Sequence, residues 1–137
     1  MGKDIFDAKA PAGKLIADAL AQATREDKKV LLLFGANWCP WCHRLHRALT
    51  TDLPIQARLN QKFVLVHIDV NTRNDKNRNA DVLTKYGNPV ERFGLPVFVL
   101  LDKTGTLLTT RETASLTGNI DQEVAAHVLA FLEQWSN

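Results

Sequence analysis

Residues 30–46 read VLLLFGANWCPWCHRLH, and the character of the chain changes in the middle of this segment. Val30–Phe34 is a continuous apolar run that is too short for a typical helix, and such a run predicts a buried strand. Residues 35–37 interrupt the strand, and from Cys39 onward the apolar positions take a helical spacing. Cys39 and Cys42, the two cysteines of the chain, therefore stand where a strand gives way to a helix.

Three kinds of chemistry use cysteines at this spacing. Cys39 and Cys42 fit a dithiol redox pair, and with His43 they also match the C-x-x-C-H signature of covalent haem attachment. His46 completes a set of two thiols and two imidazoles for zinc. Haem attachment usually needs a distal Met or His, and the one methionine is Met1, although His46, His67 and His127 are present. The order of strand, dithiol and helix does not resemble a cytochrome and would be left unexplained by haem. A structural zinc site usually draws its ligands from two separated loops, whereas these four lie within about two helical turns. The pattern favours the dithiol.

Composition narrows the class of protein. The chain has 137 residues, of which 45% are hydrophobic and 23% charged, as in an ordinary globular protein, so residues 1–137 are expected to form one domain. The net charge of +2 is too small to indicate nucleic-acid binding. Since no apolar run approaches the roughly 18 residues of a membrane span, none is expected. Two cysteines do not make a disulfide scaffold, and no cofactor or metal is expected.

The order of the elements predicts an α/β fold. The apolar runs Val30–Phe34 and Phe63–Ile68 are joined through a helix, so their strands should be parallel with a right-handed crossover. A hairpin over residues 96–110 adds two antiparallel strands. We therefore predict a central mixed four-stranded sheet, flanked by helices on both faces, with its core over about residues 12–135. Helices are expected at 12–27, from Cys39, from about Pro54, at 80–86 and at 121–135 with Asp121 as N-cap, and polar loops at 71–79 and 87–94.

Three segments resemble the thioredoxin family, over about Ala17 to Trp135. They are VLLLFGANWCPWC (30–42), FVLVHIDVN (63–71) and FGLPVFVLLDKTGTLL (93–108). Within that family the chain looks most like small bacterial disulfide reductase and isomerase domains. The resemblance implies a thioredoxin-like fold and a thiol–disulfide oxidoreductase that reduces or isomerises protein disulfides. A redox-inert or redox-sensing module that uses the fold to bind another protein is the alternative.

The roles of the two cysteines follow from their positions. Cys39 should lie near the N-terminus of a helix, where unpaired N–H groups and the helix dipole lower the pKa of a thiol. We expect Cys39 to be the exposed nucleophile and Cys42, one turn on and more buried, to resolve the mixed disulfide. Pro40 suits the first helical turn because its missing N–H costs little there.

The resemblance also assigns residues around the dithiol. The family places a cis proline against it, so Pro96 takes that position in the motif Gly94-Leu95-Pro96, and the backbone of Leu95 is expected to pair with a substrate chain. Trp38 and Trp41 flank the cysteines and are candidate substrate contacts.

One departure from the family bears on the mechanism. Thioredoxins commonly bury a carboxylate six residues before the nucleophile, near a lysine on the next strand, and the aligned positions here are Leu33 and Leu65. The usual proton acceptor for Cys42 is therefore absent. Resolution by Cys42 should be slow near neutral pH and should accelerate as the pH rises.

The expected partners are proteins. We expect disulfide-bonded substrate proteins and a thiol–disulfide electron donor, with the domain acting as a monomer. The start, MGKDIFDAKAPAGK, has no apolar signal segment. The expected location is periplasmic or otherwise extracytoplasmic, with a leader absent from this sequence, and a cytoplasmic location is the alternative. The redox direction stays open, because it depends on the reduction potential and on the recycling partner.

Overall fold

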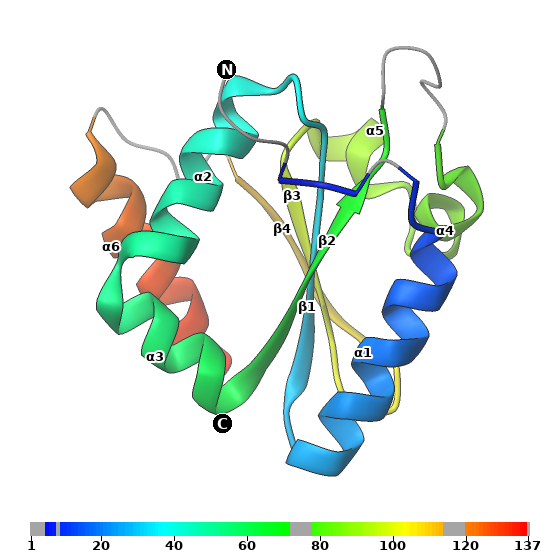
Figure 1. The fold of residues 1–137 in the computed structure, drawn as a ribbon, viewed down its shortest axis with the longest axis horizontal. Helices are drawn as coiled ribbons and strands as arrows, with labels where there is room; N and C mark the ends of the chain where they lie inside the picture. The colour runs from blue at the N-terminus through cyan, green and yellow to red at the C-terminus, as the bar shows by residue number, and fades with distance from the viewer. Residues whose placement is uncertain (1–4, 8, 72–77, 114–119, 137) are drawn as a thin grey trace.

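The computed structural model describes residues 5–7, 9–71, 78–113 and 120–136. Among these residues, four strands form one mixed sheet in the order β2-β1-β3-β4 (Figure 1). β1 pairs with β2 in parallel and with β3 antiparallel, and β4 pairs antiparallel with β3, so the predicted fold class is confirmed. The elements are α1 (Ala12–Glu26), β1 (Lys29–Gly35), α2 (Pro40–Thr51), α3 (Leu53–Lys62), β2 (Phe63–Asp69), α4 (Ala80–Lys85), α5 (Pro89–Phe93), β3 (Val97–Leu101), β4 (Leu107–Glu112) and α6 (Asp121–Gln134).

The sheet separates two hydrophobic clusters, and β1 contributes to both. Leu31 and Leu33 belong to the cluster under α2, α3 and α6, whereas Leu32 and Phe34 belong to the cluster under α1 and α4. Successive side chains of a strand point to opposite faces, so a strand covered on both faces must be apolar at every position. The helices on the two sides are visible in Figure 1. This double burial is why residues 30–34 read as an unbroken apolar run.

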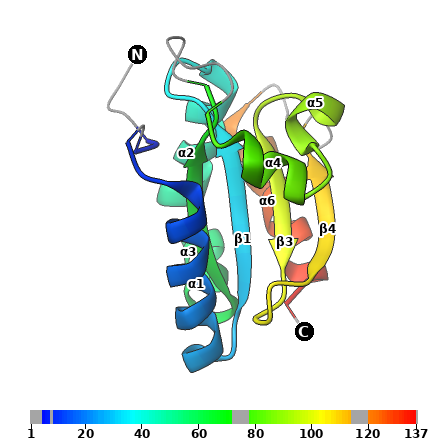
Figure 2. The ribbon, with the colours of Figure 1, turned by 90° about the vertical axis from the view of Figure 1, so that its right-hand side faces the viewer.

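One end of the sheet gathers several connections. The C-terminal end of β1, the start of α2, α4 and α5 lie together at this end (Figures 1 and 2). The N-terminal segment, residues 5–7, lies at the same end, where both Ile5 and Phe6 bond to the side chain of Asn37. This end of the sheet therefore brings segments from distant parts of the sequence next to the two cysteines.

Two sequence predictions are wrong in detail. The predicted loop at 87–94 contains the short helix α5, which begins at Pro89 after Asn88, a residue in the left-handed region with φ 54°. Asp121 is not the N-cap of α6: that position is taken by Ile120, and the carboxylate of Asp121 lies 3.1 Å from Nε of Arg47 instead. Surface ion pairing with α2 has taken the side chain away from the capping position.

Strand bounds also differ slightly from the prediction. β3 begins at Val97 rather than Pro96, and β4 runs from Leu107 to Glu112, beyond the expected end at Thr110. Among the described residues, no helix has both the length and the apolar character that a membrane crossing requires.

We expect Leu32→Ala to lower the free energy of unfolding by about 2–5 kcal/mol, because it leaves a cavity in the fully buried central strand. Leu53→Ala is the matched control: Leu53 is 74% exposed, and its loss should change stability by no more than about 0.5 kcal/mol. Urea unfolding followed by circular dichroism measures both. Equal midpoints for the two variants would contradict the placement of β1 in the core.

Candidate active site

The two cysteines lie at the junction between the C-terminal end of β1 and the start of α2. Cys39 is the N-cap of α2, with extended backbone at φ −86° and ψ 114°, and Pro40 follows in the first turn. The backbone N–H of Cys42 donates to Sγ of Cys39 at 3.2 Å. A sulfur atom thus fills the role that a Ser or Asp oxygen fills at most helix starts, and Pro40 gives up no intrahelical hydrogen bond there.

The two thiols differ little in exposure. Both cysteines are unpaired in the structure. Cys39 is 5% exposed and Cys42 is fully buried, so the expectation that Cys39 would be freely exposed is wrong. The reason is the cap itself, because Sγ of Cys39 turns toward the first N–H groups of α2 rather than toward solvent. Cys39 therefore offers only a small exposed surface to a partner.

Their acidities differ strongly. The pKa of Cys39 is lowered from 9.0 to about 6, chiefly because the Cys42 thiol donates a hydrogen bond to its sulfur. The backbone N–H groups of Cys42 and Trp41 and the nearby His43 act in the same direction, and burial opposes them. The pKa of Cys42 is raised, chiefly by that same hydrogen bond and then by burial. At neutral pH the pair therefore holds one proton, and it stays on Cys42.

The two tryptophans lie differently. Trp41 is 48% exposed, with the Arg44 guanidinium 5.2 Å from its ring centroid. Trp38 is half-buried, packs against the cluster that contains both cysteines, and donates from Nε1 to the carbonyl oxygen of Asn71 at 2.9 Å. Trp41 is thus available to a partner, whereas Trp38 mainly ties the turn before Cys39 to the end of β2.

The segment Gly94-Leu95-Pro96 links α5 to β3. The Leu95–Pro96 peptide bond is cis, and Gly94 has φ 80°, a conformation that side chains rarely adopt. Leu95 is half-buried and packs against both hydrophobic clusters, including the one that contains the cysteines. Thr113 donates a hydrogen bond from its hydroxyl to the carbonyl oxygen of Pro96.

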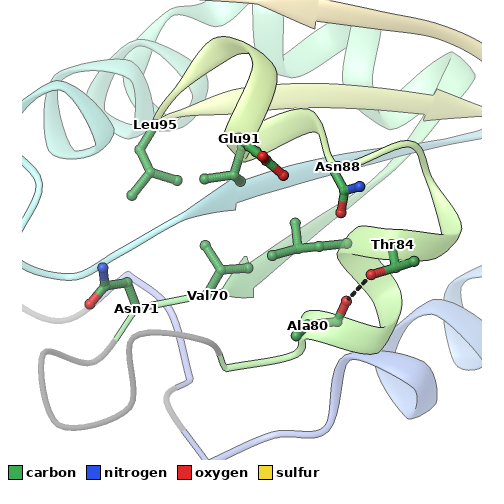
Figure 3. A pocket seen from close by; sticks show the side chains of 9 residues that line it. Val70, Asn71, Ala80, Thr84, Asn88, Glu91 and Leu95 are labelled. Atoms are coloured by element: carbon green, nitrogen blue, oxygen red, sulfur yellow. Dashed lines mark hydrogen bonds between the residues drawn. The ribbon is translucent and has the colours of Figure 1, made fainter.

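A hollow of about 350 Å³ opens beside Leu95, between α4, α5 and the end of β2 (Figure 3). Asn71, whose carbonyl oxygen holds Trp38, forms part of its rim. The hollow does not follow from the sequence pattern, because one wall is α5, whose five residues carry too little periodicity to predict a helix. Its lining is Val70, Asn71, Ala80, Leu83, Thr84, Asn88, Val90, Glu91 and Leu95.

The histidines near the dithiol point elsewhere. Nε2 of His43 lies 2.6 Å from the carbonyl oxygen of Asn37, and Nδ1 of His46 lies 3.1 Å from Nε2 of His67 on β2. The four residues considered for zinc therefore do not converge on one point. Within the described ranges, no three His, Cys, Asp or Glu side chains are grouped closely enough to hold a metal ion.

The site contains residues that sequence reasoning did not select. His67 is the partner of Leu33 across the β1–β2 ladder, and burial lowers its pKa to about 4. Leu33 is fully buried, as expected for the position of the missing carboxylate, while Leu65 is half-buried. Phe6 is also part of the site, although it belongs to a polar N-terminal stretch without hydrophobic periodicity. The signal in the sequence was a single aromatic residue, of a kind that is usually buried, within that polar stretch.

The family model described as thioredoxin-like matches residues 13–103, about two thirds of the chain. This chain belongs to the thioredoxin-like family. The match contains the parallel strand pair, both cysteines and the Gly94-Leu95-Pro96 segment.

Within the thioredoxin-like family, several named proteins are similar to the chain. The crystal structure of a disulphide isomerase from Xylella fastidiosa Temecula1 superposes with a TM-score of 0.84 at 28% identity, over 100% of both chains. The reduced C-terminal domain of DsbD from Neisseria meningitidis gives a TM-score of 0.62 at 26% identity, over 91% of this chain and 96% of that domain. The thiol:disulfide interchange protein DsbD of Actinobacillus pleuropneumoniae is 33% identical over 95 residues, which are 69% of this chain but 15% of that protein.

We expect iodoacetamide to label Cys39 before Cys42, with a rate that follows a pKa of about 6. Below pH 6 the rate should fall about tenfold per pH unit, because the thiolate alone reacts, and it should level off above pH 7. Peptide mass spectrometry against pH measures both sites. Faster labelling of Cys42, or a midpoint near the ordinary cysteine value of about 8.5, would sink the assignment.

Proposed function

We propose that the chain is a thiol–disulfide oxidoreductase that reduces or isomerises protein disulfides through Cys39 and Cys42. The observation that carries this proposal is the state of Cys39, whose sulfur caps a helix, accepts the Cys42 hydrogen bond and has a pKa of about 6. Such a cysteine is mostly thiolate at neutral pH, and the thiolate is the attacking species. The similarity to proteins named for disulfide interchange and disulphide isomerase supports the same activity.

The reaction takes two displacement steps. The Cys39 thiolate attacks one sulfur of the substrate disulfide, forms a mixed disulfide, and the other substrate sulfur leaves as a thiolate. Cys42 then gives up its proton and attacks the Cys39 sulfur, which forms the Cys39–Cys42 disulfide and releases the second substrate thiolate. Two electrons pass from the dithiol to the substrate. A partner dithiol protein must return them, and in isomerisation a substrate thiol attacks the mixed disulfide before Cys42 does.

We place the substrate chain along Leu95. An extended chain beside the residue before Pro96 can add backbone hydrogen bonds, a short form of strand addition. The exposed face of Trp41 offers aromatic contact area next to the reacting sulfur. The hollow beside Leu95 then lies next to the path of the chain and can accept a neighbouring side chain (Figure 3).

The setting of this activity is part of the proposal. Disulfides form and persist in oxidising compartments, so we place the protein outside the cytoplasm. Residues 12–135 act there as one domain and as a monomer. Whether reduction or isomerisation dominates depends on the reduction potential of the dithiol and on the recycling partner.

The second step proceeds without a strong built-in base. Leu33 occupies the place of the family's carboxylate, and His67 has a pKa of about 4, which makes it a weak proton acceptor at neutral pH. We propose that the proton of Cys42 leaves to water. The rate of the second step is set by how readily the buried Cys42 thiol ionises.

We expect the protein to accelerate insulin reduction by dithiothreitol. Cys39→Ser should return the rate to that of dithiothreitol alone, because no nucleophile remains at the helix start. Cys42→Ser should keep the first step and accumulate a mixed disulfide on Cys39, visible by mass spectrometry under non-reducing conditions. Leu53→Ala serves as the active control, because Leu53 is 74% exposed and lies at the start of α3, beyond the C-terminal end of α2. A parent protein that leaves the rate unchanged would contradict the proposal and favour a redox-inert binding module.

A further inference from the structure

The N-terminal segment is fastened to the turn before Cys39. The side-chain oxygen of Asn37 accepts the backbone N–H groups of Ile5 at 3.0 Å and Phe6 at 2.8 Å. The side-chain amide of Asn37 donates in return to the carbonyl oxygen of Phe6 at 2.9 Å. One side chain, two residues before Cys39, thus satisfies three backbone groups more than 30 positions away. Hydrogen bonds to its backbone thus hold the N-terminal segment next to the dithiol.

The ring of Phe6 is packed against the resolving cysteine. Phe6 is 2% exposed and belongs to the same cluster as Cys39 and Cys42. A Cβ atom built on Gly35 would lie 2.5 Å from Cζ of Phe6 and 2.9 Å from Sγ of Cys42. The ring and the sulfur therefore lie against the same face of Gly35, and the absence of a side chain at that position makes room for both.

The Phe6 ring also contacts a histidine of β2. Phe6 and His67 form an edge-to-face contact with centroids 5.6 Å apart, and His67 in turn bonds to His46. Asp69, opposite Gly35 on β2, is buried and lies 3.3 Å from Nε of Arg78. The other titratable groups on α2 are His43, Arg44, His46 and Arg47, and Cys39 caps that helix. α6 carries Asp121, which pairs with Arg44 and Arg47, together with Glu123, His127 and Glu133, and Asp7 follows Phe6 in the chain.

We propose that Phe6, held in place by Asn37, is a positioning residue that keeps water away from the Cys42 thiol and thereby sets the rate at which Cys42 resolves the mixed disulfide. This inference rests on the proposed function. It gives the N-terminal segment a role in the reaction, although that segment lies outside the residues matched by the family model.

The effect of Phe6 is greatest in the mixed disulfide. In the reduced protein, the pKa of Cys42 is raised first by its hydrogen bond to Cys39 and second by burial. Once the Cys39 sulfur is bonded to substrate it carries no charge, so that hydrogen bond weakens and burial becomes the leading cause. The cover over Cys42 then decides how much thiolate is present, and only the thiolate can attack.

A pH-jump experiment tests the inference. The reduced protein is treated with one equivalent of the aromatic disulfide dithiobis(nitrobenzoate) at about pH 4, where Cys42 stays protonated and the adduct on Cys39 persists. Stopped-flow mixing to a series of higher pH values then starts resolution, and the released nitrothiobenzoate reports its rate. The midpoint of the rate against pH gives the pKa of Cys42 in the adduct.

We expect Phe6→Ala to lower this midpoint by about one pH unit, because water reaches the thiol. The fraction of Cys42 present as thiolate at pH 7 then rises about tenfold. A thiolate of lower pKa is a weaker nucleophile, so its intrinsic rate of attack falls about threefold. Resolution at pH 7 should therefore be about threefold faster. Asn37→Ala keeps the Phe6 ring but removes the three hydrogen bonds that the Asn37 side chain makes to the N-terminal segment. It should shift the midpoint in the same direction. Phe6→Leu keeps an apolar cover and should restore the parent profile.

Phe63→Ala is the matched control, since Phe63 is 3% exposed but lies at the other end of β2. It should lower stability without moving the midpoint. An unchanged midpoint in both Phe6→Ala and Asn37→Ala would overturn the inference and leave Phe6 a purely structural residue. The proposed function is tested separately by the parent: an adduct that releases no nitrothiobenzoate at any pH would contradict it, whatever the variants do.

Discussion

The hydrogen bond from the Cys42 thiol to the Cys39 sulfur is the interaction on which the chemistry of this protein depends. It gives two chemically identical side chains different acidities: the pKa of Cys39 is lowered to about 6, whereas the pKa of Cys42 is raised and Cys42 keeps its proton. The backbone N–H of Cys42, which donates to the same sulfur at 3.2 Å, adds to the effect. Neither contact exists without the first turn of α2, so the acidity of Cys39 is a property of the fold.

The position of the first turn of α2 is set by β1. β1 lies between β2 and β3, is buried on both faces, and ends at Gly35 immediately before the turn that leads into α2. Because both neighbours and both clusters hold β1, the start of α2 is fixed in position relative to the sheet. Gly35 adds a second condition, since any side chain there would collide with both Phe6 and Cys42. The site is thus built where the most constrained strand of the sheet ends.

As a consequence of this arrangement, Cys42 is buried and has no strong base beside it. Leu33 and Leu65 stand where thioredoxins commonly place a charged pair, which avoids burying an unpaired charge. His67, the ladder partner of Leu33, has its pKa lowered to about 4 by burial and is largely neutral. The first displacement is therefore favoured at neutral pH, while the second depends on ionising a desolvated thiol. In the proposed reaction, a slow second step would leave more time for a substrate thiol to attack the mixed disulfide, which is the branch that leads to isomerisation.

The sheet and the cysteine positions could be predicted from sequence because they depend on local patterns. Residues 30–34 and 63–68 are apolar runs of strand length, and the two cysteines follow the first run directly. The helix α5 was missed because five residues carry too little periodicity, and Asp121 was misplaced because two arginines of α2 compete for its carboxylate.

The contacts that surround Cys42 could not be predicted in the same way. Phe6 and Asn37 are 31 positions apart, and His46 and His67 are 21 apart, so these pairs exist only after the chain has folded. No spacing rule connects them in one sequence. The local pattern was thus enough to place the two cysteines at the strand-to-helix junction, but the side chains that surround them required the tertiary structure.

The central claim is that one proton is shared unequally between the two thiols, and carbon-13 NMR of the cysteine Cβ atoms in the reduced protein tests it most directly. The account predicts that the Cys39 signal titrates with a pKa of about 6 and that the Cys42 signal shows no ionisation below about pH 9. A Cys42 signal that titrates first, or a Cys39 pKa at the ordinary cysteine value, would contradict the account.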